Sequence, residues 1–174
     1  IIASAISSPP GSRDCDGGGS CGVAGMVAVA QSTRGSVDNV RQIEEGVLES
    51  GFVQSDVAYW AFRGEELFLT GGPLKSLRAI ANLYPETIHL VVRADAEIAT
   101  VADIKGKRIS LDRPGSGTRV DAQLVLRAFG IAEADIEAFA LGSGAAADAL
   151  REGEIDGFFF VAGTPATAVL ELAE

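Results

Sequence analysis

The sequence predicts an α/β fold of two lobes, each with a mixed or parallel sheet flanked by helices, and three observations lead to this prediction. Strand-like runs alternate with helical patterns along most of the chain, which is typical of largely parallel sheets covered by helices. Glycine recurs with serine or threonine where a predicted strand passes into a helix. A module of strand, serine-capped helix, Glu-Gly stop and second strand occurs twice, which indicates two similar lobes with a ligand cleft between them.

The composition argues against several classes of protein. With 174 residues, the chain can form one substantial domain or two small lobes. Its formal net charge is −10 and no block of Lys and Arg occurs, which argues against a nucleic-acid partner. No apolar run approaches the roughly 20 residues that a membrane span needs. We therefore expect a soluble globular protein.

The first part of the chain is rich in glycine, proline and serine. It starts at Ile1, and "IIASAISSPP" lacks the charged start and length of a signal peptide, so we expect a processed or trimmed end. Cys15 and Cys21 are the only cysteines and lie in the loop "RDCDGGGSC". We predict a disulfide between them, which would imply an oxidising compartment. Two free thiols on a cytosolic loop are the alternative.

The elements of the first half follow from periodicity and from start and stop residues. In order, we expect the end of a helix in "IIASAISS", a strand in 26–31, a helix over 36–45 with Ser36 as N-cap, a strand in 50–56, a helix over 56–63 capped by Ser55, a strand-like segment in 77–84 and a strand in 87–94.

The second half continues the alternation. We expect a helical turn in 101–106, a strand in 108–112, a helix over 118–129 with Thr118 and Asp121 in capping-box spacing, a strand in 137–142, a helix over 143–153, a core strand in 157–163 and a last helix opened by Thr164 and Pro165. The run Phe158–Phe160 is predicted to be buried on both faces of its sheet.

Four turns that start helices carry glycine, serine or threonine. They are "TRGS" (33–36), "QSD" (54–56), "PGSGT" (114–118) and "AGT" (162–164). Unobstructed backbone N–H groups and the positive end of a helix dipole attract an anion. Since the carboxyl ends of parallel strands lie at one sheet edge, these turns would converge on one cleft. The alternative is that each turn is only a helix cap.

Several motifs in order resemble a known family of receptors. "GFVQSDVAYWAFRG", "AIANLYPETIHLVVRADA", "VADIKGKRISLDRPGSGTRVDA" and "ADALREGEIDGFFFVAGTPATAVLELA" resemble the TAXI-type solute receptors of tripartite ATP-independent periplasmic (TRAP) transporters, from about Ala24 to the end. The resemblance implies a type II periplasmic-binding-protein fold and secretion to the periplasm. It also implies capture of a glutamate-like or related carboxylate for a TRAP permease, without catalysis or a cofactor.

The resemblance also implies a domain division and a set of ligand-binding residues. Residues 1–90 would be an incomplete first lobe, 91–163 the second lobe, and 164–174 the start of the return to the first lobe, so that the chain resembles a central fragment. The ligand-binding residues would be Thr33, Gly35, Ser36, Gln54, Ser55, Asp56, Ser116, Gly117, Thr118 and Phe160. Gln54 and Asp56 suit a ligand amino group, and the hydroxyls and bare amides suit its carboxylate.

Other functions have weaker signals. A cytoplasmic effector-binding regulatory domain shares the two-lobed architecture, and an enzyme on this fold would need Asp56 or Asp112 as its catalytic group. The G-x-S-x-G match at 18–22 lacks the strand and helix of a hydrolase elbow, and His89 sits in a predicted strand as a packed residue. One His and two Cys do not build an ordinary zinc site. As counter-ions for a carboxylate, Arg34, Arg113 and Arg119 remain equal candidates.

Overall fold

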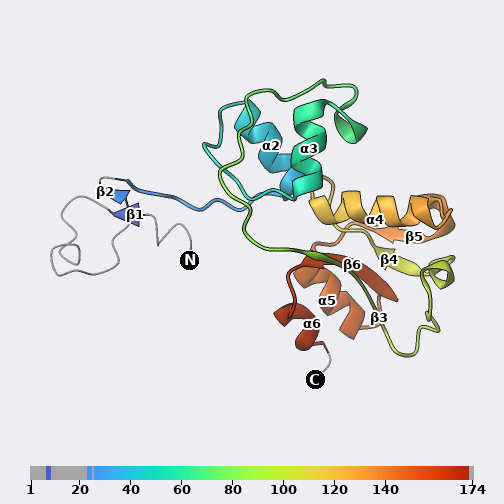
Figure 1. Ribbon diagram of the computed structural model, residues 1–174. Coiled ribbons are helices and arrows are strands. Elements are labelled where there is room, and N and C mark those ends of the chain that lie inside the picture. Colours follow the sequence, from blue (N-terminus) through green and yellow to red (C-terminus); the bar gives the residue numbers. More distant parts are fainter. Residues whose placement is uncertain (1–6, 9–22, 25, 173–174) are drawn as a thin grey trace. The chain divides into compact units, whose positions relative to one another are not determined.

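The computed structural model describes residues 7–8, 23–24 and 26–172 (Figure 1). The chain divides into two compact units, Ile1–Thr33 and Arg34–Glu174. In the first unit, β1 (Ser7–Ser8) pairs in parallel with β2 (Val23–Ala24). The expected helix end at "IIASAISS" is therefore wrong at its last two residues. Residues 26–31, predicted to be a strand, have no regular structure, and Val29 is 76% exposed.

The second unit contains a four-stranded mixed sheet in the order β3-β6-β4-β5. The strands are β3 (Thr87–Val92), β4 (Arg108–Ser110), β5 (Glu137–Phe139) and β6 (Gly157–Ala162). β4 pairs in parallel with both β5 and β6, as the alternation of strands and helices predicts. The edge strand β3 runs antiparallel to β6, with Thr87 opposite Ala162 and Val92 opposite Gly157. The α/β class is thus confirmed, with one antiparallel edge strand.

Helices cover both faces of this sheet. Figure 1 shows α4 (Gly117–Ala128) on one face and α5 (Ser143–Arg151) on the other. Because successive strand residues point to opposite faces, Phe159 packs in the cluster under α4 and Phe158 in the cluster under α5. The α4 cluster also contains Ile104, Ile109, Leu111, Ala122, Leu126, Ile131 and Ile136. The prediction of a core strand buried on both faces is confirmed.

A helical pair forms the rest of the second unit's regular structure before the sheet. It consists of α2 (Ser36–Glu44) and α3 (Ser55–Arg63), followed by the 3-10 turn η2 (Glu66–Phe68). Val37, Val40, Val57, Ala61 and Phe68 form its core. Val37 and Val40 lie three residues apart on α2, and Val57 and Ala61 four apart on α3, so each pair shares one helix face.

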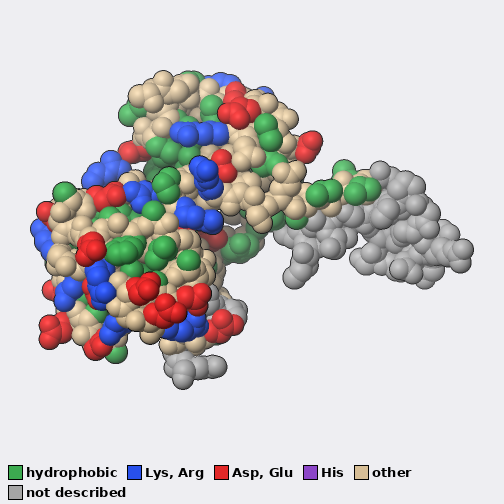
Figure 2. Space-filling model, turned by 180° about the vertical axis from the view of Figure 1, so that it is seen from behind, with side chains coloured by type: hydrophobic (Ala, Val, Ile, Leu, Met, Phe, Trp, Pro, Cys, Tyr) green, Lys and Arg blue, Asp and Glu red, His purple; other side chains and the backbone are tan. Residues whose placement is uncertain are grey.

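The segments 50–56 and 77–84, predicted to contain strands, are not strands. No strand lies among the described residues 34–86, so neither segment has a ladder partner for its backbone groups. Apolar side chains consequently remain at the surface of this part (Figure 2). Phe52 is 59% and Ile80 is 88% exposed.

Three short elements complete the unit: the 3-10 turns η3 (Val101–Ile104) and η4 (Glu133–Asp135), and the helix α6 (Thr167–Leu170). The prediction that Thr164 and Pro165 open the last helix is wrong, because α6 starts at Thr167. No helix in the described ranges is long and apolar enough to cross a membrane.

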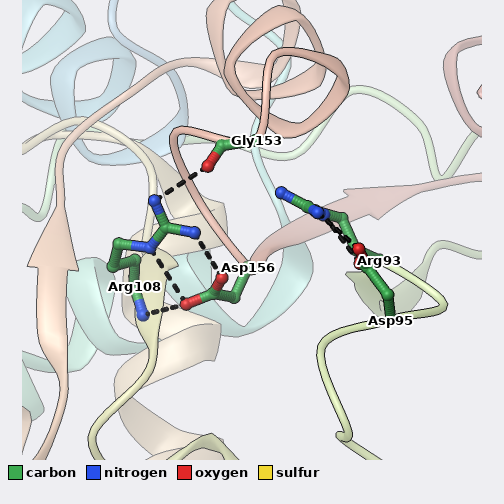
Figure 3. Close-up of polar contacts among 5 residues, drawn as sticks. All are labelled: Arg93, Asp95, Arg108, Gly153 and Asp156. Carbon is green, nitrogen blue, oxygen red and sulfur yellow. Dashed lines mark hydrogen bonds and ion pairs between the residues drawn. The ribbon is translucent and has the colours of Figure 1, made fainter.

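An ion pair joins the starts of β4 and β6 (Figure 3). Arg108 donates from Nη2 to Asp156 Oδ1 at 2.6 Å and from its backbone N–H to Oδ2 at 2.8 Å. Its Nη1 also donates to the Gly153 carbonyl at 2.8 Å. The hydrogen bond from the Arg108 side chain lowers the pKa of Asp156 below its usual value. The nearby pair of Arg93 and Asp95 is a separate contact on the loop after β3.

Candidate functional site

Three of the four predicted turns meet at the amino ends of α2, α3 and α4. A Cβ atom placed on Gly35 would lie 3.0 Å from the Ser116 Cα. A Cβ atom placed on Gly117 would lie 1.2 Å from Gln54 Oε1, so a side chain at this position would displace Gln54. The glycines at these helix starts therefore allow the turns to touch each other directly.

Gln54 lies at the centre of this turn cluster, which we define as Gly35–Ser36, Gln54–Asp56 and Ser116–Gly117. Its Nε2 donates to Asp121 Oδ2 at 2.6 Å, and its Oε1 accepts from Ser36 Oγ at 3.3 Å. Its backbone N–H donates to the same Ser36 hydroxyl at 3.1 Å. The side-chain amide of Gln54 thus links the helical pair to α4.

The start of α2 is capped by a carbonyl group of the loop before α4. The backbone N–H groups of Val37 and Asp38 both donate to the Gly115 carbonyl, at 3.1 and 3.2 Å. The N-cap residue is Gly35, and Ser36 is the first helical residue, so the prediction of Ser36 as cap is wrong by one position. The Ser36 hydroxyl instead bonds Gln54. The first turn of α2 is occupied by the protein itself.

The start of α4 differs from the predicted capping box of Thr118 and Asp121. Ser116 is the N-cap, and its Oγ accepts from the Arg119 backbone N–H at 3.0 Å. Thr118 lies within the first turn and is half-buried. Likewise Gln54, and not Ser55, is the N-cap of α3, and Ser55 is exposed.

Asp121 is the functional candidate that sequence reasoning missed. Its side chain is buried, with 4% of the residue exposed, and it binds Gln54. Burial raises the pKa of Asp121 to about 7, and a hydrogen bond to Asp56 and the charge of Asp56 act in the same direction. The hydrogen bond from Gln54 lowers the pKa in part, while the Glu86 charge raises it further. The carboxyl of Asp121 thus changes its charge near neutral pH. Its position as the single acidic residue of α4, next to the apolar residues of that amphipathic helix, was the available signal.

Two more carboxyl groups belong to the surroundings of Asp121. Partial burial, and then the charge of Asp56, raise the pKa of Glu86. Asp56 Oδ1 accepts from the Val57 backbone N–H at 2.7 Å, as expected at a helix start. This arrangement suits a cationic group such as an ammonium, which would relieve the repulsion among the carboxylates.

Phe160 is not part of the turn cluster. The Phe160 side chain packs with the α5 cluster, and its ring centre is 6.2 Å from that of His89. His89 is a packed strand residue, as predicted, and its Nε2 is buried without a hydrogen-bond partner in the described structure. Thr33 belongs to the first unit. In the fourth turn, Gly163 lies against Tyr84 and Pro85.

The three candidate counter-ions occupy different environments. Arg34 lies beside Gly115, where its Cβ is 3.3 Å from the position of a Cβ on that glycine. Arg113 lies against Gly142 in the same way. Arg119 donates to Glu133 Oε1 at 2.6 Å and lines a pocket between the helical pair and α4. Of the three, Arg119 is the one that borders this pocket.

Some predicted features lie outside the described residues. These are the Cys15–Cys21 disulfide and the G-x-S-x-G match at 18–22. In the described ranges, no group of three or more His, Cys, Asp or Glu could hold a metal ion. Asp112, the other proposed catalytic group, bonds the Arg113 backbone N–H through its Oδ1 at 2.6 Å.

Comparisons with known proteins identify a family and several binding proteins. The NMT1-like family matches residues 21–174. The periplasmic aliphatic sulphonate binding protein SsuA from Escherichia coli shares 29% identity over 49% of this chain and 28% of its own, with a TM-score of 0.42. The alkanesulfonate-binding protein SsuA from Xanthomonas axonopodis pv. citri, bound to MOPS, shares 36% identity over 42% and 24%, with a TM-score of 0.35.

A third solved structure is the second substrate binding domain of a putative amino acid ABC transporter from Streptococcus pneumoniae. It shares 27% identity over 45% of this chain and 33% of its own, with a TM-score of 0.34. The matches thus span between about a quarter and a third of these proteins. All three are described as binding proteins and none as an enzyme.

Proposed function

Because the chain belongs to the NMT1-like family, we propose that it is part of a periplasmic solute receptor. The receptor captures a small carboxylated solute without chemical change and delivers it to a membrane permease. Because the motifs resemble those of TAXI receptors, the proposed permease is of the TRAP type. The proposed solute is glutamate-like.

The observation that carries this proposal is the convergence of three helix starts with polar side chains around Gln54. Ser116, Gly117 and Thr118 begin α4, where backbone N–H groups and the helix dipole favour a carboxylate. Asp121, one turn further along α4, accepts from the Gln54 amide and interacts with Asp56, and these two carboxyl groups favour an ammonium group. An amino acid carries a carboxylate and an ammonium group on one carbon, so its two charges suit the start of α4 and the neighbouring carboxyl groups.

The contacts in the turn cluster also indicate how the receptor would open. Gln54 bonds Asp121 directly, and Gly115 caps α2, so a solute must part the helical pair from α4 to enter. The solute then replaces protein–protein hydrogen bonds by its own. Such a ligand shifts the equilibrium between open and closed forms by its difference in affinity for the two.

The test is calorimetric titration of the 174-residue protein with L-glutamate, with succinate and ethanesulfonate for comparison. The double variant Ser116→Ala with Thr118→Val removes two hydroxyl groups at the start of α4. We expect it to weaken glutamate binding by about tenfold or more, since each lost hydrogen bond to a charged group contributes about 1.5–3 kcal/mol.

Ser143→Ala is the matched control, because Ser143 is an exposed residue at the start of α5, in another part of the unit. We expect it to bind as the unsubstituted protein does. Equal affinities of the double variant and the control would refute the assignment of the site. If ethanesulfonate binds more tightly than glutamate, the solute class is a sulfonate and not a carboxylate.

A further inference from the structure

A pocket separate from the Gln54 hydrogen bonds lies between the helical pair and α4. Its volume is about 270 Å³. Val37 and Arg41 of α2 and Glu66 and Leu67 of η2 line one side. The α4 side is lined by Arg119, Val120, Gln123 and Arg127, with Gly115 and Ser116 at the end. Figure 2 shows Lys and Arg side chains gathered where the helical pair meets the rest of this unit.

The lining carries an excess of positive charge. It contains three arginines, Arg41, Arg119 and Arg127, and one carboxylate, Glu66, in a chain whose formal net charge is −10. Like charges gathered in a concave site focus the electrostatic field and attract counter-ions. The local sign is therefore opposite to that of the whole protein.

The three arginines differ in whether a carboxylate of the protein already pairs with them. Arg119 pairs with Glu133 at 2.6 Å, and Arg127 pairs with Glu66 at 3.1 Å. In the described part of the chain Arg41 has no carboxylate within ion-pair distance, and its guanidinium carbon lies 5.8 Å from the centre of the Phe68 ring. Arg41 thus retains donor groups for a ligand, from the opposite side of the pocket to α4.

Backbone strain occurs in the same lining. Glu66 has a φ of 48°, in the left-handed region that residues with a side chain seldom adopt. Strained residues of this kind cluster at ligand-binding sites, where the surrounding structure maintains them. The strain belongs to the residue that holds Arg127 at the pocket wall.

We propose that this pocket binds a small organic anion with a short apolar segment, such as a short-chain dicarboxylate. The planar guanidinium groups match carboxylates in a two-pronged geometry. Val37, Leu67 and Val120 form an apolar wall that accepts methylene groups. Because its walls come from both the helical pair and α4, an anion bound here ties these parts together. The pocket shares Ser116 with the turn cluster but contains neither Gln54 nor Asp121, and the proposal does not depend on the solute site proposed above.

The test uses glutarate as the probe and its uncharged diamide, glutaramide, as the comparison, at low ionic strength. Thermal unfolding and calorimetric titration of the 174-residue protein measure binding. We expect glutarate to raise the unfolding midpoint and glutaramide to leave it unchanged. Arg41→Gln and Arg127→Gln should each weaken glutarate binding by about tenfold or more, since each removes charge-assisted hydrogen bonds.

Arg63→Gln is the control, because Arg63 is an exposed arginine of α3 whose partner is Glu65 and which does not line the pocket. Its glutarate affinity should match that of the unsubstituted protein. Arg41 and Arg127 are exposed, so both variants should fold, and circular dichroism checks this. Absence of glutarate binding, equal binding of glutaramide, or undiminished glutarate binding in both the Arg41→Gln and the Arg127→Gln variants overturns the proposal.

Discussion

Asp121 shows how one buried carboxyl group connects two parts of the fold. It belongs to α4 and accepts a hydrogen bond from Gln54 at the start of α3. Asp56 and Glu86 add negative charge around it. The protonated form of Asp121 can donate to Asp56, whereas the ionised form repels it. The stability of this contact therefore depends on the protonation of Asp121.

The pH dependence of unfolding should report this group. The folded-state pKa of Asp121 is raised to about 7 from an ordinary value of 3.8, so the folded protein binds the proton more tightly than the unfolded chain. Its contribution to stability is present below the unfolded pKa and is lost as the pH rises from about 4 to about 7. The free energy of unfolding should fall in this window by at most about 1.4 kcal/mol per pH unit.

Asp121→Asn imitates the protonated carboxyl, since an amide can accept from Gln54 and donate to Asp56. Urea unfolding from pH 4 to pH 8 should give this variant a flatter profile than the unsubstituted protein. Asp95→Asn, an exposed carboxyl beside Arg93, should keep the original profile in this window. Parallel profiles for the Asp121→Asn variant and the unsubstituted protein would contradict the role given to Asp121.

At the scale of elements, the sequence predicts helices better than strands. The helices α2, α3, α4 and α5 lie within a residue or two of the predicted ranges. The strand-like runs 26–31, 50–56 and 77–84 have no strand structure. A helix satisfies its backbone groups internally, whereas a strand needs a partner, and periodicity does not identify that partner.

The sequence predicted which turns start the helices, but not which residue of each turn is the N-cap. The sequence places Ser and Gly at the start of each helix, but Gly35, Gln54 and Ser116 are the caps in the structure. The contacts made by Gln54 with Ser36 and Asp121 join positions 18 and 67 residues apart. Local spacing has no signal for such contacts.

The ion pair at the starts of β4 and β6 gives a prediction for strand pairing. Asp156→Ala removes three hydrogen bonds from Arg108 and leaves that guanidinium without its carboxylate. We expect the free energy of unfolding to fall by about 1–3 kcal/mol, measured by urea denaturation at pH 7. Asp148→Ala, which removes an exposed partner of Arg151, should change it by about 0.5 kcal/mol or less. Similar losses in both variants would mean that the strand contact contributes no more than a surface pair.

At the scale of the whole molecule, the described cores lie in the second unit. The clusters under α4 and α5 and in the helical pair all fall between Val37 and Leu172. The four-stranded sheet and most of the match to the NMT1-like family lie in this region. The predicted division at residues 90 and 163 remains a prediction.

Limited proteolysis should distinguish exposed segments, which are cut early, from the sheet, which resists cleavage. Val27 is 61%, Val29 76% and Ile80 88% exposed, and their segments lack regular structure. Thermolysin should therefore cut first in 26–30 and 77–84, while the region from β3 to β6 resists, because exposed chain with few contacts opens at low free-energy cost. Mass spectrometry of the early fragments identifies the cuts. Early cuts within α4 or β6 would contradict this order.

The Gly115 carbonyl that caps α2 changes what an anion meets at that helix. Its oxygen holds both the Val37 and the Asp38 amides. An arriving carboxylate could gain these donors only by displacing the carbonyl, so binding there is an exchange of one acceptor for another. Its affinity would reflect the difference between the two acceptors, and the released carbonyl would need water or a new donor. Of two otherwise equal anions, the better acceptor would then be preferred.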